Sequence, residues 1–262
     1  MLKFIKGITA TVLSFLFILT IPTYASINTK INADDVLLNT GAPKELVEKL
    51  SDLQKEDIAS FIIKGNAIYS GSETSRYYID EESQELKLIN PLMRGEISKA
   101  DLQLSTDVWT STTGTTAGNS YVTGTYEWLT KKLQIQDHLF TISMPSGWNV
   151  DSSTVKKVTW KKQDYLYQWE IIDNVNGRSF SNSDNSVTWS SLSDKVLNSP
   201  LMFFRGSCTF VARKTSSTAS NQVKLQYGYA TGIGSIGVTY GGFGVTYTGT
   251  SGLSQASETF NF

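Results

Sequence analysis

The stretch Ile236-Gly-Val-Thr-Tyr240, Gly241-Gly242, Phe243-Gly-Val-Thr-Tyr247 is the most informative part of this chain. It lies in a run from Leu225 to Ser257 without Asp, Glu, Lys, Arg or His, although charged residues make up 18% of the sequence. Gly-Gly between two alternating arms predicts a β-hairpin, because both central positions of the favoured two-residue turn need positive φ. Since strand side chains alternate, the apolar residues of both arms then share one face.

A two-residue turn also predicts which side chains of the hairpin lie opposite each other. The expected pairs are Tyr240 with Phe243, Val238 with Val245, and Ile236 with Tyr247. The other face holds only glycine and threonine: Gly237, Thr239, Gly244 and Thr246. Such a hairpin fits either a β-sandwich or a lipid bilayer. We expect packing within the sandwich, because each five-residue arm is shorter than the roughly 9–11 residues that a strand needs to span a bilayer.

Membrane insertion of the hairpin remains the alternative interpretation. On that interpretation, the candidate contacts with a membrane or a partner are Tyr240, Phe243 and Tyr247. Trp148 is added because it follows the turn Pro145-Ser-Gly147, where we expect an exposed tryptophan. The sequence alone does not decide between a core hairpin and a membrane-active one.

The remainder of the chain predicts a mainly β protein with a small N-terminal helical part. From about residue 101 to residue 262, short alternating stretches separated by Gly, Ser, Asn and Thr indicate an antiparallel β-sandwich domain. Residues 26–65 predict helices, with Pro43 opening one of them and Gly65-Asn66 ending the last. Residues 66–100 carry little periodicity and are interpreted as a mixed connecting region, with short strands expected at 67–69, 76–79 and 86–89.

The first 25 residues have the pattern of a secretory signal peptide. Lys3 and Lys6 precede the uncharged, largely apolar run 8–21, and small residues at positions 23 and 25 predict cleavage after Ala25. The expected product is a secreted, extracellular chain of 237 residues with 21 basic and 24 acidic side chains, and a formal charge of −3. An acidic balance gives no support to nucleic-acid binding and argues against cationic attack on anionic membranes.

The inventory of catalytic and metal-binding residues is poor. His138 is the only histidine and Cys208 the only cysteine, so neither a standard zinc site nor an internal disulfide is expected. A triad of His138 with Asp137 or a distant Asp lacks a Gly-x-Ser-x-Gly motif to supply its serine, and we expect an ordinary surface or loop histidine. We expect Cys208 to be a buried structural residue and no cofactor to be bound.

Three further groups of residues have both a chemical and a simpler interpretation. Glu127 and Glu170 each adjoin a tryptophan and are candidates for glycoside cleavage, although exposed strand glutamates are the default. The 173–185 loop offers oxygen ligands without the spacing of a calcium loop, so a solvated loop is expected. The lysine pairs 156–157 and 161–162 suit a solubilising strand edge, with contact to teichoic acid or lipid phosphate as the alternative.

Three segments together carry a resemblance to a known group. They are the signal peptide, Leu37-Leu-Asn-Thr-Gly-Ala-Pro43, and the strand Tyr126-Glu-Trp-Leu129 leading to Trp148. The chain resembles secreted Gram-positive proteins of mostly unassigned function, and its layout and size are similar to large, heat-labile bacteriocins of the geobacillin type. No catalytic residues come with this resemblance.

The resemblance implies a secreted, non-enzymatic antibacterial protein that acts on the membrane of target cells. One alternative is a secreted β-sandwich module that binds cell-wall polymer or carbohydrate through its aromatic residues. The other is a glycoside hydrolase that uses two carboxylates. The expected partner is thus a bacterial membrane or a cell-wall polymer, and the sequence leaves the oligomeric state open.

Overall fold

A computed structural model describes most of the chain outside its first 31 residues. The described residues are 32–89, 100–131, 138–163, 168–176, 185–190, 202–230, 236–241, 243–249 and 252–262. The predicted signal peptide and its cleavage site lie outside these ranges, as do Asp137 and most of the 173–185 loop. No helix among the described residues is long and apolar enough to cross a membrane.

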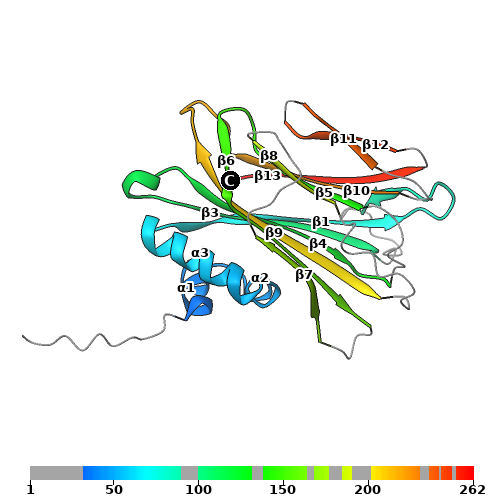
Figure 1. Cartoon of the computed structure of the whole chain (residues 1–262), viewed down its shortest axis with the longest axis horizontal. Coiled ribbons are helices and arrows are strands. Elements are labelled where there is room, and N and C mark those ends of the chain that lie inside the picture. The colour runs from blue at the N-terminus through cyan, green and yellow to red at the C-terminus, as the bar shows by residue number, and fades with distance from the viewer. Residues whose placement is uncertain are drawn as a thin grey trace, which may run out of the picture. The chain divides into compact units, whose positions relative to one another are not determined.

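The strands form two large antiparallel sheets and one separate hairpin (Figure 1). The larger sheet has the order β2 (Leu86–Leu88), β1 (Ile68–Ile79), β3 (Leu102–Thr110), β4 (Ser120–Trp128), β9 (Phe203–Lys214), β6 (Trp148–Lys162) and β7 (Glu170–Asn176). The smaller sheet has the order β13 (Leu253–Asn261), β10 (Gln222–Ala230), β5 (His138–Ser143) and β8 (Ser186–Ser190). The hairpin pairs β11 (Ile236–Tyr240) with β12 (Val245–Gly249). The prediction of an antiparallel β-sandwich is confirmed.

The main core lies between the two large sheets. At Gly124 of β4, a Cβ atom would lie 2.6 Å from Cδ1 of Ile142 and 2.9 Å from Cδ1 of Leu225, so only glycine lets the smaller sheet approach this closely. Cys208 is completely buried in this core and makes no disulfide, as the sequence predicted. The largest buried side chains of the cluster are Trp128, Trp148, Trp189, Tyr227, Phe204 and Phe210.

The N-terminal helices cover the outer face of the larger sheet. They are α1 (Ala33–Asn39), α2 (Lys44–Lys49) and α3 (Asp52–Gly65), and a short 3-10 turn, η1 (Gly114–Thr116), follows β3. Ser51 and Gln54 form a capping box at the start of α3, and Asn66 ends it in the left-handed conformation. Gln54 Nε2 also donates to Ser207 Oγ at 3.2 Å, which ties this helix to β9.

Two of the sequence-based expectations are wrong. Residues 68–79 are not part of a connecting region, because β1 is a continuous twelve-residue strand that pairs with β3 over most of its length. The β-sandwich therefore begins at about residue 68 and not at residue 101. The lysine pairs do not mark a sheet edge either, because β6 lies between β9 and β7. Lys156 forms an ion pair with Asp57 of α3.

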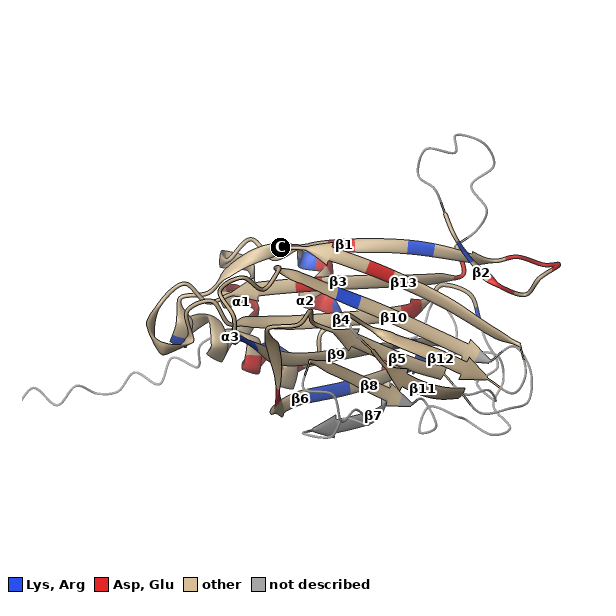
Figure 2. Ribbon diagram, turned by 90° about the horizontal axis from the view of Figure 1, so that it is seen from above, with Lys and Arg blue, Asp and Glu red and all other residues tan. Residues whose placement is uncertain are grey.

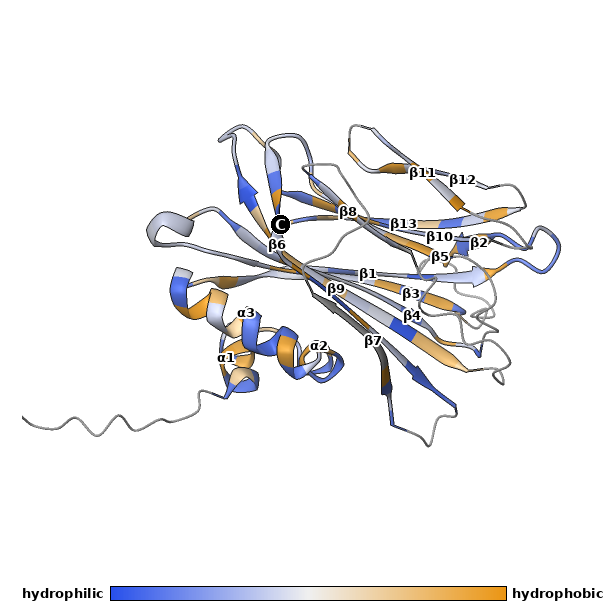
Figure 3. Cartoon of the chain, viewed as in Figure 1, coloured by the Kyte–Doolittle hydropathy of each residue, from blue (hydrophilic) through white to orange (hydrophobic). Residues whose placement is uncertain are grey.

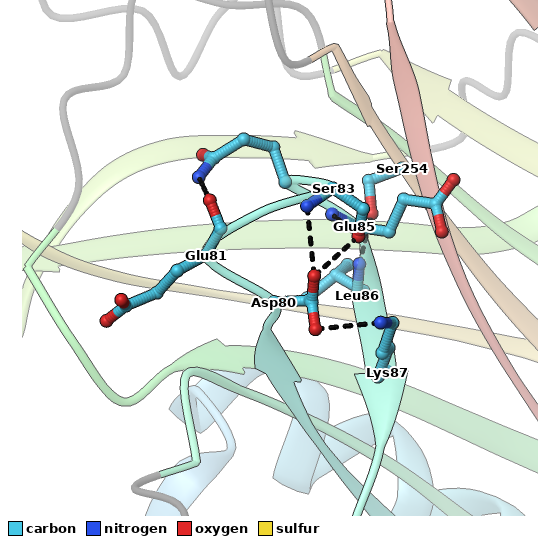
Figure 4. A network of polar contacts seen from close by, with 8 residues as sticks. Asp80, Glu81, Ser83, Glu85, Leu86, Lys87 and Ser254 are labelled. Carbon is cyan, nitrogen blue, oxygen red and sulfur yellow. Dashed lines mark hydrogen bonds and ion pairs between the residues drawn. The ribbon is translucent and has the colours of Figure 1, made fainter.

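The turn between β1 and β2 helps to fix strand β13 (Figure 4). Within the turn, Asp80 accepts hydrogen bonds from the backbone and hydroxyl of Ser83 and forms an ion pair with Lys87 at 2.7 Å. The backbone N–H of Leu86 then donates to Ser254 Oγ at 2.5 Å. Tyr77 Oη donates to the carbonyl of Ser257 at 2.6 Å, so β13 is held to the larger sheet at two points.

Glu258 makes the stability of the contact between β13 and the larger sheet dependent on pH. Its side chain is buried between β13 and the larger sheet, and this burial raises its pKa to about 8. A carboxyl whose pKa is raised on folding stabilises the fold when protonated, and this contribution is lost as pH rises from the unfolded pKa towards 8. We expect the unfolding free energy to fall over that interval, by up to about 1.4 kcal/mol per pH unit.

The test compares Glu258→Gln with the unchanged protein by thermal unfolding between pH 5 and pH 9. The substitution should flatten the pH dependence and raise the melting temperature above pH 8. Glu81→Gln, in the exposed turn between β1 and β2, is the matched control and should leave the profile unchanged. An unaltered profile in Glu258→Gln would contradict this role of Glu258.

Candidate functional site

The predicted hairpin exists, but its register differs from the expected one by two residues. The observed partners are Tyr240 with Val245, Val238 with Tyr247, and Ile236 with Gly249. A shift of two residues keeps each side chain on its original face, so the apolar face survives. Phe243 is half-buried and lies in the connection between the strands, outside the pairing that the sequence predicted for it.

Gln226 of β10 accounts for the register. Its Oε1 accepts a hydrogen bond from the backbone N–H of Val245 at 2.8 Å, and its Nε2 donates to the carbonyl of the same residue at 2.9 Å. Gly244 precedes this point with φ +125°, and a Cβ there would lie 2.4 Å from Gln226 Oε1. A side chain 19 residues away in the sequence thus sets where β12 begins.

The hairpin packs its apolar face on the outer face of the smaller sheet. Tyr247 is buried over β10, where a Cβ at Gly228 would lie 2.7 Å from its ring, and its hydroxyl donates to Thr141 Oγ1 at 2.8 Å. Val245 is also buried, next to Leu139. The remaining apolar hairpin residues, Ile236, Val238 and Tyr240, are only half-buried. Orange bands on β11 and β12 mark this apolar character in Figure 3.

The outer face of the smaller sheet, here called the seat, is predominantly polar. Strand alternation and register place the following residues on this face of β13, β10, β5 and β8: Leu253, Gln255, Ser257, Lys224, Gln226, Gly228, Leu139, Thr141, Ser143, Ser186 and Thr188. Among these eleven residues, only Leu139 and Leu253 have apolar side chains. Thr141 and Thr188 also share a hydrogen bond of 2.8 Å across β5 and β8. The apolar face of the hairpin therefore lies on a sheet face suited to water.

The hairpin is not needed for the pairing of the strands that flank it. Strands β10 and β13 pair without interruption from Gln222 with Asn261 to Ala230 with Leu253. The 22 residues 231–252, here called the excursion segment, separate Ala230 from its pairing partner Leu253. With the observed connection at residues 241–244, ten residues remain for the first arm and eight for the second, close to the roughly 9–11 that a bilayer-spanning strand needs. Figure 2 shows no charged residue on β11 or β12.

Trp148 does not belong to this site. It was expected to be exposed, but only 2% of its surface is accessible, so that prediction is wrong. Its Nε1 donates to the carbonyl of Ser220 at 2.9 Å, and its ring contacts Phe262. The turn before it folds back onto the 214–221 loop, where a Cβ on Gly147 would collide with Ala219. The turn residues next to Trp148 in the sequence gave no sign that the 214–221 loop would cover it.

The two candidate hydrolytic carboxylates do not converge on one site. Glu127 on β4 forms an ion pair with Lys49 of α2 at 2.7 Å. Glu170 on β7 is exposed and pairs with Lys161 at 3.6 Å. The register across β4, β9, β6 and β7 aligns Glu127 with Arg205, Trp160 and then Ile171, so alternation points Glu170 to the opposite face. This arrangement contradicts a two-carboxylate hydrolase built on these residues.

His138 is buried and not a surface or loop residue. It begins β5, and its Nδ1 shares a hydrogen bond with the hydroxyl of Tyr227, which also accepts from Trp128 Nε1 at 3.0 Å. Its packing against these rings gives it a structural role in the core. Among the described residues, no three His, Cys, Asp or Glu side chains gather as metal ligands. The 173–185 calcium candidate lies largely outside those residues.

Comparison with known proteins gives structural likenesses alone. No family model and no curated protein matches the chain. A collagen-binding domain from a Staphylococcus aureus adhesin is 9% identical over 54% of this chain and 88% of its own, with a TM-score of 0.31. Clostridium perfringens delta-toxin is 8% identical over 74% and 87%, with a TM-score of 0.28. At this level of identity and overlap, these likenesses assign no ligand or activity to this chain.

Gln226 offers a test of how independent the hairpin is from the core. Gln226→Ala removes both hydrogen bonds to Val245, at a cost of about 0.5–1.5 kcal/mol each. Amide exchange in residues 236–249 should therefore accelerate about tenfold, while exchange in β10 and β13 stays slow because their pairing is intact. Gln222→Ala, on the same strand, is the matched control. Equal acceleration throughout the smaller sheet would show that the hairpin is part of the core.

Proposed function

We propose that this is a secreted, non-enzymatic antibacterial protein and that the excursion segment, residues 231–252, is its membrane-active part. One observation carries the proposal: an apolar, uncharged hairpin rests on a polar seat, between two strands that pair without it. Release would expose Leu139, Leu253 and otherwise mostly polar side chains to water. The hairpin would bring its apolar face to the lipid.

The energy of the seated state is modest. Val245 and Tyr247 are the two hairpin side chains that become buried, and full burial is worth about 1.5–3 kcal/mol for an apolar side chain. The polar contacts to Gln226 and Thr141 add about 0.5–1.5 kcal/mol each. Transfer into lipid would in addition bury Ile236, Val238 and Tyr240, which are only half-buried on the seat. This difference in burial is what would let a membrane shift the balance towards the released state.

A single hairpin cannot cross a bilayer alone, because its outer backbone groups would lack hydrogen-bond partners. The proposal therefore requires several copies that close a barrel, and at two strands per copy an eight-stranded barrel needs about four. The hairpin suits that arrangement because its two faces differ. Ile236, Val238, Tyr240, Val245 and Tyr247 would face lipid, and the glycines and threonines would face the lumen.

A disulfide between hairpin and seat tests release directly. An ideal Cβ at Gly228 lies 3.1 Å from Cγ of Tyr247, which is compatible with the Cβ separation of about 3.5–4.5 Å in disulfides. Gly228→Cys with Tyr247→Cys, in a Cys208→Ala background, should abolish dye leakage from vesicles and killing of Gram-positive cells when oxidised. Reduction should restore both activities.

The matched control links the two arms to each other and leaves the seat free. Tyr240→Cys with Val245→Cys joins directly opposed residues of β11 and β12, so the closed hairpin can still leave the sheet. This variant should cause leakage in both redox states. Leakage by the oxidised seat-linked protein would contradict the proposed function, and so would an unmodified protein that binds cells without killing them.

A further inference from the structure

A second cluster of residues lies on the outer face of the larger sheet, apart from the hairpin. It is formed by Trp160 and Lys162 of β6, Phe203 and Arg205 of β9, and Trp169 just before β7, and is here called the Arg205 cluster. Arg205 and Trp160 are direct partners in the pairing of β9 with β6. The cluster therefore lies on the neighbouring strands β6 and β9 inside the sheet. Trp169 completes it from the position just before the edge strand β7.

The guanidinium of Arg205 is surrounded by aromatic rings. Its central carbon lies 4.6 Å from the ring centroid of Trp160 and 4.5 Å from that of Trp169. Lys162 Nζ adds a second positive charge, 4.7 Å from the Trp169 ring and 5.2 Å from the Phe203 ring. Trp169 and Lys162 are half-buried, whereas only 7% of the surface of Arg205 is accessible. Two cations thus converge on one set of rings.

Among the described residues, the two carboxylates next to this cluster in the sheet register each pair with a lysine outside it. Glu127, the direct partner of Arg205 on β4, forms its ion pair with Lys49, and Glu170 forms its ion pair with Lys161. Burial lowers the pKa of Arg205 to about 10, and the attraction of Glu127 offsets only part of that effect. Within the described part of the chain, the buried Nε of Arg205 has no hydrogen-bond partner. A buried donor on a charged group without a partner is costly.

We propose that the Arg205 cluster is a binding site for a phosphate group. Aromatic rings contact the faces of a guanidinium, while its N–H groups point outward in its plane, so stacking leaves the donors for an anion. Arginine binds phosphate through two parallel hydrogen bonds, and Lys162 supplies a second charge at the exposed side. The ligand chemistry is a phosphodiester, as in a lipid headgroup or in a polyol-phosphate polymer of the cell wall.

The phosphate site does not depend on release of the hairpin, which packs on the other sheet. Binding is measured with full-length protein and three probes: inorganic phosphate, phosphatidylglycerol vesicles, and lipid-free poly(glycerol phosphate). Phosphate should change the tryptophan fluorescence through Trp160 and Trp169. Stronger binding to vesicles than to the polymer would assign the phosphate to lipid, and the reverse would assign it to the wall.

Arg205→Met should weaken binding at least tenfold, and Arg205→Lys should weaken it less. Arg213→Met is the matched control, because Arg213 lies on the same strand, is exposed and pairs with Asp151. If Arg205→Met does not fold, as judged by its melting temperature, Trp169→Ala and Lys162→Met replace it and should each weaken binding several-fold. Binding that is unchanged in the folded variants, or absent from the unmodified protein with all three probes, overturns the proposal.

Discussion

The pairing of β10 with β13 is the constraint on which the rest of the structure depends. The two strands lie on either side of residues 231–252 in the sequence. They pair from Gln222 with Asn261 to Ala230 with Leu253. Their inner faces supply Leu225, Tyr227 and Phe260 to the main core. Because this pairing runs without interruption below the hairpin, we expect the core to hold whether or not the hairpin is seated. The proposed function requires this, since the hairpin must leave the sandwich without unfolding it.

Alternation predicted which residues of the hairpin share a face, but it did not predict their partners. Gly241-Gly242 favours a two-residue turn, yet Gln226 binds both backbone groups of Val245 and starts β12 later. No local signal shows a contact made by a distant strand. The continuity of strand β1 was missed for a related reason, although short strands were expected at both of its ends. Its Ser, Gly and Thr residues lack alternation, and it is a strand because β3 and β2 supply its hydrogen bonds.

The Arg205 cluster was also beyond the reach of the sequence. Trp160, Trp169 and Arg205 are separated in the chain, and only the register of β9 with β6 and of β6 with β7 brings them together. The lysine pairs did suggest phosphate contact, and Lys162 does lie in this cluster, although Lys156 binds the helical layer. The proposed anchoring and membrane-active surfaces lie on different sheets, so the protein can hold a target surface while the hairpin moves.

The most direct test of hairpin release is a fluorophore scan along residues 236–240 and 245–249, with single cysteines labelled in a Cys208→Ala background. In water, labels on the half-buried and buried positions should report contact with the seat. After addition of vesicles, emission should alternate with a period of two, with lipid contact at positions 236, 238, 240, 245 and 247 and water contact between them. Emission that does not change on membrane addition would contradict release of the hairpin.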